Sequence, residues 1–302
     1  MQGIWRLGGL PPREIARRVW LYIYEGTLFT RTAALSYYFL LALFPLLLFL
    51  TTMLGFLADR GTRLRAELLS YFSRVLPSSA FTLVYTTVDE ISRNATGGKL
   101  SFSLLAALWT ASSGVVAIGD ALNSSYGVPE SRPWWRVRLN AMGLTVALAV
   151  LLVLALALVL YGGELGAVLA GYFEQGDAFL VAWGVAQVPL MILFVLLALA
   201  LLYYFAVDVR DQKWYWITPG SLIGVALWLA VSSAFRLYLR YFDSYSVTYG
   251  SLGAVIVLML WFYLTGAAIL VGGKINAEIE QAAARAGVPG AKLRGERTPD
   301  EE

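Results

Sequence analysis

The side chains of this chain that could do chemistry gather in one otherwise apolar segment, residues 100–127, and in the loop that follows it. The segment, LSFSLLAALWTASSGVVAIGDALNSSYG, carries Ser112 and Ser113 near its middle and Asp120 and Asn123 near its end. A charge at the centre of a membrane helix costs about 3 kcal/mol on insertion scales, so each polar group there needs a partner or a purpose. Two interpretations are open. One is a cytoplasmic vestibule that admits a polar or anionic headgroup, and the other is an ion-pair cluster that fixes the helix end.

The loop after this segment adds charges of both signs, and other apolar stretches contribute isolated polar residues. Gln187 lies beside Pro189, which removes a backbone hydrogen bond in mid-span and predicts a kink. The candidate substrate path consists of Ser112, Ser113, Asp120, Asn123, Tyr126, Glu130, Arg132, Gln187 and Arg236.

The residue inventory argues against an enzyme. The chain contains no Cys and no His, which removes thiolate chemistry, the commonest metal ligand and the commonest general base. Its acidic pairs have no supporting motif, and it has no Walker A sequence, no GxSxG and no dinucleotide fingerprint. We therefore expect no catalytic residues, no cofactor, no metal and no nucleic-acid partner.

The elements that position these residues are membrane helices. Of the 302 residues, 59% are hydrophobic and 14% charged, whereas soluble domains have about 25% charged residues. A spanning helix needs about 20 apolar residues, and the sequence predicts an all-α protein with six such spans. The expected spans are Ala33–Ala58, Leu100–Leu122, Leu139–Tyr161, Ala178–Val207, Trp216–Tyr238 and Gly250–Gly273.

The positions of Lys and Arg predict the orientation. With the N-terminus inside, most of the 23 Lys and Arg residues fall in cytoplasmic segments, and the loop from Gly162 to Asp177 has none. Both termini are then cytoplasmic, in a bacterial inner membrane. Residues 1–32 are expected to form either a basic amphipathic segment suited to an anionic surface or an ordinary polar lead-in to the first span. Residues 33–280 are expected to form the membrane domain, and residues 281–302 a disordered cytoplasmic tail.

Two further patterns concern how the spans pack. An outer helical hairpin is expected at 59–99, between the first two spans. An offset of 119 residues aligns the second span with the fifth, and Pro45 and Pro189 interrupt the first and fourth, which suggests a 3+3 inverted repeat. Chance similarity between Ala/Leu-rich segments remains the alternative. Gly220-xxx-Gly224 and Ala268-xxx-Gly272 form small-residue packing faces.

Several segments together resemble the YihY / virulence factor BrkB family of bacterial inner-membrane proteins. They are TRTAALSYYFLLALFPLLL (30–48), LWTASSGVVAIGDALNSSYGVPESRPWWRVRL (108–139), ITPGSLIGVALW (217–228) and YGSLGAVIVLMLWFY (249–263). The resemblance implies six spans with both termini cytoplasmic. It matches Asn123, Tyr126, Glu130 and Arg132 to a loop motif of the family, and Tyr249, Gly250, Ser251 and Gly253 to its last-span motif. Lys274 departs from the acidic residue that the family usually shows.

The family carries the name ribonuclease BN for some members and a link to lipid or solute export for others. The residues favour a transporter or exporter whose partners are membrane lipids and a lipid or small-molecule cargo; nothing in the sequence specifies an oligomeric state. A non-transporting envelope scaffold is the alternative, and a membrane ribonuclease has the least support. At the end of the last span, Lys274 and Glu278 are one helical turn apart and are expected to pair at the membrane interface, where they need not be buried.

Overall fold

The computed structural model describes residues 7–57, 97–171, 176–209, 215–241 and 251–296, together with the single positions 66, 69, 70, 73 and 85. This part of the chain is helical and contains no strand, as the sequence predicts. After a short 3-10 turn, its helices are α1 (Pro12–Tyr24), α2 (Thr27–Leu57), α5 (Gly97–Tyr126), α6 (Trp134–Ala170), α7 (Gly176–Phe205), α8 (Pro219–Tyr241) and α10 (Ser251–Arg285).

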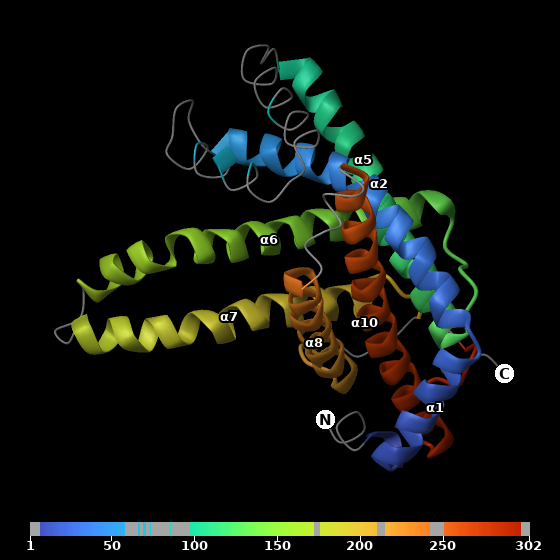
Figure 1. Ribbon diagram of the computed structural model, residues 1–302. Helices are drawn as coiled ribbons and strands as arrows, with labels where there is room; N and C mark the ends of the chain where they lie inside the picture. Colours follow the sequence, from blue (N-terminus) through green and yellow to red (C-terminus); the bar gives the residue numbers. More distant parts are fainter. Residues whose placement is uncertain are drawn as a thin grey trace.

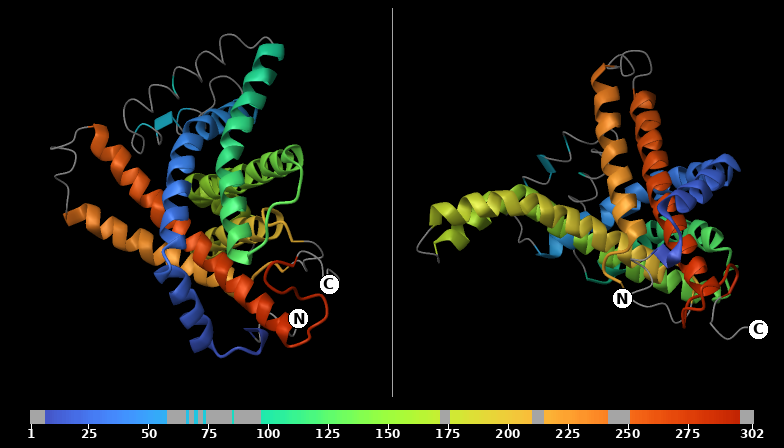
Figure 2. Two further views of the ribbon diagram at one scale, coloured as in Figure 1. Left: turned by 90° about the vertical axis from the view of Figure 1, so that its right-hand side faces the viewer. Right: turned by 90° about the horizontal axis from the view of Figure 1, so that it is seen from below.

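The long helices pack as neighbouring pairs that diverge from one end of the molecule. α2 packs against α5, α6 against α7 and α8 against α10, and α10 also contacts α1, α2 and α5. The α6–α7 pair extends to one side of the other helices, while α1 and the end of α10 lie where the pairs converge (Figures 1 and 2). The convergent end therefore brings together helices that are distant in sequence, such as α1 and α10.

Five helices in the described part are long and apolar enough to cross a membrane. They are Leu105–Tyr126, Trp134–Ala170, Phe179–Phe205, Pro219–Tyr238 and Val255–Arg285. The first expected span lies in α2, whose side chains at 44 and 47–57 are outside the described residues. The chain is thus a multi-pass helical membrane protein, while the count of six spans and the inverted repeat stay predictions. Pro45 and Pro189 lie inside α2 and α7, so neither proline ends its helix.

The small-residue faces of α8 and α10 meet directly. Their spacing predicts that each is a packing face, and the structure shows that they pack against each other. A Cβ atom placed on Gly220 would overlap the carbonyl oxygen of Gly272, and one on Gly224 would lie 3.4 Å from the carbonyl oxygen of Ala268. The Tyr203 hydroxyl of α7 donates to the Ile269 carbonyl at 2.8 Å in the same crossing. Backbone meets backbone here because none of the glycines has a side chain to hold the helices apart.

The start of α8 is fixed by a capping arrangement that reaches across to α10. The Ser221 amide donates to the Thr218 hydroxyl oxygen at 3.0 Å, and the Thr218 amide donates to the Ser221 hydroxyl oxygen at 2.9 Å. The Asn276 side-chain oxygen accepts from the Gly220 amide at 3.0 Å, and its NH₂ donates to Thr218. Side chains thus satisfy amides that a helix start leaves without intrahelical partners.

Lys274 and Glu278 pair as predicted, with 2.7 Å between Nζ and Oε1, but their expected exposure is wrong. Lys274 and Glu278 are each only 7% exposed, so the pair is buried. The 35 residues of α10 span about 52 Å, well beyond a hydrocarbon core of about 30 Å, and α1 packs along the extension. From α1, Arg18 bonds Glu278 at 3.0 Å, and the Tyr22 ring centroid lies 5.5 Å from the Lys274 ammonium.

The C-terminal segment differs from the disordered tail expected after residue 280. α10 continues to Arg285, and the chain then turns back, so that Lys292 is 3% exposed with its Nζ 3.6 Å from Glu280. The difference arises because Ala282 and Ala283 bury an apolar face within the helical assembly, which the composition of the segment does not reveal. Residues 297–302 lie outside the described residues.

Other expectations fall partly or wholly outside the described residues. Of the hairpin at 59–99, only the single positions named above and the first turn of α5 are described. In the last-span motif, Tyr249 and Gly250 are outside the described residues, Ser251 begins α10 with its side chain not described, and Gly253 is buried on α10.

Candidate functional site at the end of α5

The last turn of α5 ends in a glycine with a left-handed backbone. Gly127 has a φ of 74°, its amide donates to the Ser124 carbonyl at 3.1 Å, and the Val128 amide donates to the Asn123 carbonyl at 3.0 Å. These two bonds form a Schellman motif, which satisfies carbonyls that the helix end leaves open. The turn directs residues 128–133 back toward the end of α7.

Asn123 joins three segments of the chain. Its NH₂ group donates to Glu130 Oε2 at 2.9 Å, and its side-chain oxygen accepts from the Asp208 amide at 2.7 Å. The residue is 3% exposed, so both polar ends of the amide are satisfied inside the protein. Asn123 therefore holds the end of α5, the following loop and the segment after α7 in one arrangement.

Arg132 completes this network and caps α7. Its guanidinium makes two bonds of 2.8 Å to the Glu130 carboxylate, and its Nη2 donates to the Ala206 carbonyl at 2.9 Å. Asp208 accepts from the Ser131 amide at 2.8 Å and from the Ser131 hydroxyl at 2.6 Å. The hydrogen bonds that Arg132 donates to the Glu130 carboxylate raise the pKa of Arg132 above its usual range despite partial burial. A cation at carbonyls of a helix C-terminus also opposes the negative end of the helix dipole.

A polar cavity of about 470 Å³ opens beside the network. Asp120, Asn123 and Glu130 line it from α5 and the loop, and Arg294 lines it from the C-terminal segment. Among the described residues, the Asp120 carboxylate has no hydrogen-bond partner, and its electrostatic neighbours are Glu130, Arg31 and Arg132. Behind Asp120, the adjoining space toward α6 shrinks to about 10 Å³, at the lower limit for one water molecule.

Ser112 and Ser113, which the sequence predicts on the same substrate path as Asp120, do not line the cavity. Arg138 of α6 donates to their hydroxyl oxygens at 3.1 and 3.2 Å. The Arg138 guanidinium also lies 4.5 Å from the centroid of the Trp109 ring. The serines thus pair with a cation inside the α5–α6 contact, which accounts for polar groups at this depth without a cargo.

The remaining candidates do not line the cavity. Tyr126 is 5% exposed within the apolar core. Gln187 lies against Gly162, at the contact of α6 with α7, and Arg236 is exposed on α8. The structure therefore brings together Asp120, Asn123, Glu130 and Arg132, and separates the other predicted residues from them.

Sequence reasoning missed Ser131, Asp208 and Arg294 as members of this site. Asp208 directly follows the predicted span Ala178–Val207, and Asp120 lies near the end of the predicted span Leu100–Leu122. Both span ends are predicted to face the cytoplasm, and this shared position is the signal that could have linked Asp208 to the site. Arg294 gave no comparable signal, because it lies in a segment whose composition suggests disorder. Within the described residues, no group of three or more Asp or Glu side chains could hold a metal ion.

Replacing Gly127 with alanine should release the C-terminal segment. A Cβ atom there would lie 2.7 Å from Cγ of Arg294, and alanine disfavours the φ of 74°. We expect a loss of about 1 kcal/mol in the free energy of unfolding and faster tryptic cleavage after Arg294. Gly26→Ala is the matched control, since Gly26 has a φ of 76° and a Cβ atom added to it would meet no atom within 4 Å. Equal cleavage rates in the two variants would show that Gly127 does not hold the segment.

The fold and the site together define a polytopic helical membrane protein with a polar network at the convergent end of its helices. Residues 22–295 match the family described as virulence factor BrkB. The chain therefore belongs to the virulence factor BrkB family.

Curated relatives agree with this assignment. A ribonuclease-like protein of Bacillus subtilis, YfkH, is 37% identical over 84% of this chain and 90% of its own length. The UPF0761 membrane protein IL2447 of Idiomarina loihiensis is 28% identical over 70% of this chain and 71% of its own. No solved structure matches.

Proposed function

We propose that this protein is a transporter or exporter of a lipid or small polar or anionic solute, residing in the bacterial inner membrane with both termini cytoplasmic. The observation that carries the proposal is the cavity of about 470 Å³, which combines the carboxylate of Asp120 with the cation of Arg294. Charges of both signs around a cavity suit a polar headgroup or solute. The family assignment supports membrane residence and leaves the cargo open.

In the proposed cycle, Asp120 contacts the cargo, and the Asn123 network closes the path beneath it. Asn123, Glu130 and Arg132 already satisfy one another, so they are positioning residues and not cargo ligands. Passage toward the membrane interior requires the narrow space lined by Asp120 and Gly119 to widen. The structure then corresponds to a closed state.

Replacing Asp120 with asparagine tests the proposal because it keeps the shape of the side chain and removes its charge. Purified protein in liposomes is assayed for movement of an acyl-labelled fluorescent phosphatidylethanolamine between leaflets and for uptake of radiolabelled glutamate. Each probe carries an anionic group for Arg294 and an ammonium group that the Asp120 carboxylate can contact. We expect wild-type protein to accelerate one of the two, and Asp120→Asn to lower that rate about tenfold or more, as for loss of a charged contact. The two arms distinguish a lipid headgroup from a free solute.

Glu25→Gln is the control, because Glu25 is an exposed carboxylate at the end of α1, away from the cavity. If Asp120→Asn transports the cargo as fast as wild type in the active assay, Asp120 does not contact the cargo. Wild-type protein that is folded and inactive in both arms would contradict the transport proposal.

The closed network favours a second candidate function, a non-transporting scaffold that organises envelope partners. If the network never opens, the polar residues serve only to join α5, α6 and α7. We propose in either case that the chain is not a ribonuclease. Highly purified protein should release no nucleotides from RNA in the presence of Mg²⁺, and cleavage that co-purifies with the protein through two separations would contradict this.

A further inference from the structure

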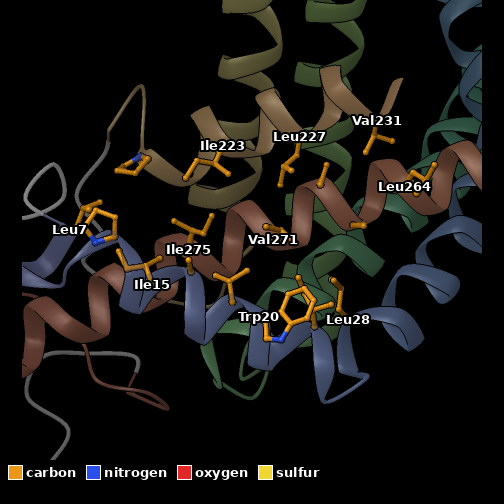
Figure 3. A pocket seen from close by; sticks show the side chains of 17 residues that line it. Leu7, Ile15, Trp20, Leu28, Ile223, Leu227, Val231, Leu264, Val271 and Ile275 are labelled. Carbon is orange, nitrogen blue, oxygen red and sulfur yellow. The ribbon is translucent and has the colours of Figure 1, made fainter. Parts of the chain in front are cut away.

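An apolar groove of about 530 Å³ runs between α1 and α8, away from the polar cavity. Figure 3 shows α10 lying between the other two helices, with Ile223 and Leu227 of α8 and Ile15 and Trp20 of α1 around the space. The volume falls in the range of about 300–1,000 Å³ typical of ligand pockets. Its walls offer hydrocarbon contacts and almost no polar atoms, so a polar solute would gain nothing by entering.

The groove has the length of one lipid chain. On α8 it extends from Pro219 to Val231, and on α10 from Leu264 to Ile275. Twelve helical residues rise about 18 Å, and one leaflet contributes about 15 Å of the hydrocarbon core. A single acyl chain lying along α10 therefore fits the groove from end to end.

The rim of the groove on α1 is basic. Ala16 and Trp20 line the groove. Arg13 lies about one helical turn before Ala16, and Arg17 lies about one turn before Trp20; both arginines are exposed. Within the described residues Arg13 has no ionic partner. The Arg17 and Arg18 side chains bond Glu14 and lower the pKa of that carboxyl to about 2, so Glu14 is ionised at neutral pH. Because α1 has three Arg residues and only this one acidic residue, it still carries a net positive charge.

The exposed aromatic residues of α1 place this rim at a membrane interface. Trp20 is 65% and Tyr24 81% exposed, and both lie on the same helix as the arginines. Exposed Trp and Tyr on a basic amphipathic helix are typical of helices that lie among lipid headgroups. A membrane surface at this rim would put the opening of the groove at headgroup level, with the rest of the groove running along α10.

We propose that this groove is a binding site for an anionic phospholipid, with one acyl chain between α1 and α8 and the phosphate at Arg13 and Arg17. The lipid fills a space that direct packing of α1 on α8 leaves open, and it fixes α1 against α10. The site is separate from the polar cavity and does not depend on the transport proposal.

The test measures lipid that stays bound when the protein is extracted from vesicles containing equal amounts of phosphatidylglycerol and phosphatidylcholine. Native mass spectrometry then counts each lipid per chain. We expect wild-type protein to retain phosphatidylglycerol in preference to phosphatidylcholine. Arg13→Gln and Arg17→Gln should each reduce that preference about fivefold, the effect expected of one basic residue near an anionic headgroup.

Filling the groove should remove the lipid whatever its headgroup. Ala267→Phe on α10 and Ala16→Phe on α1 both add a ring inside the groove, and Ala16 is exposed, so at least this variant should fold. We expect each to lower retained phosphatidylglycerol about tenfold, the change for about 1.4 kcal/mol of binding free energy. Ala157→Phe, at an exposed position on α6, is the matched control and should retain lipid as wild type does.

Three outcomes would overturn the proposal. Equal retention in wild type and both groove-filled variants would place the lipid elsewhere. An unchanged preference for phosphatidylglycerol in both arginine variants would show that Arg13 and Arg17 do not bind an anionic headgroup. A dimer mass that disappears in Ala16→Phe, with no lipid lost, would make the groove an interface between two copies of the chain. Each result is read without any transport assay, so it is independent of whether Asp120 lies on a transport path.

Discussion

Replacing Glu278 with glutamine should lower the free energy of unfolding by about 3 kcal/mol. The change removes the negative partner of Lys274, whose ammonium lies 2.7 Å from Glu278 Oε1. Lys274 is only 7% exposed, so water cannot replace that partner. Arg18, whose guanidinium lies 3.0 Å from Glu278, loses its negatively charged partner on α10 in the same step. A buried cation without a partner is costly, because neither water nor another charge replaces the interaction. Unfolding in mixed micelles with an increasing fraction of SDS, followed by circular dichroism, measures the loss.

The double variant Lys274→Met, Glu278→Gln separates a buried charge from a simple loss of packing. Removing both charges leaves no unpaired ammonium, so the double variant should be more stable than Glu278→Gln alone. Glu25→Gln, at an exposed position, should change the stability by less than about 0.5 kcal/mol. If the double variant is less stable than the single one, the buried Lys274 charge is not what makes Glu278 important.

Replacing Gly220 with alanine should separate α8 from α10 and cost about 3 kcal/mol. The added methyl group would overlap the Gly272 carbonyl oxygen and lie 2.5 Å from Oδ1 of Asn276. The Gly272 oxygen belongs to the helix backbone, so relief requires moving a whole helix. The cap that Asn276 provides for α8 would be lost with it. The same unfolding measurement detects the effect, together with loss of the monodisperse peak in size-exclusion chromatography.

Gly184→Ala is the matched control for this substitution. Gly184 lies inside α7, and a Cβ atom there meets no atom within 4 Å. Because alanine favours helix over glycine by about 0.8–1 kcal/mol, this variant should be as stable as wild type or more so. If Gly184→Ala loses as much stability as Gly220→Ala, the close contact between α8 and α10 does not explain the effect of replacing Gly220.

Local patterns in the sequence predicted the features that depend on near neighbours. Long apolar runs predicted the helices, since a chain in a membrane must satisfy its backbone hydrogen bonds internally. Spacing of four residues predicted both the Lys274–Glu278 pair and the glycine faces of α8 and α10, and the structure confirms these contacts. The sequence also singled out the polar end of α5, where Asn123 and Arg132 both bond Glu130 in the structure; a substrate path through these residues stays a prediction.

Only the tertiary structure decided which polar residues share a site and which charges are buried. Asn123 and Asp208 are 85 positions apart, and their bond depends on α7 ending beside α5. The burial of Glu278 depends on α1, more than 250 positions earlier, folding back along α10. Helical periodicity fixes the face on which a side chain lies, but the neighbour that covers that face follows from how separate helices pack. For the same reason, the basic residues of α1 were visible in the sequence, and the groove beside them was not.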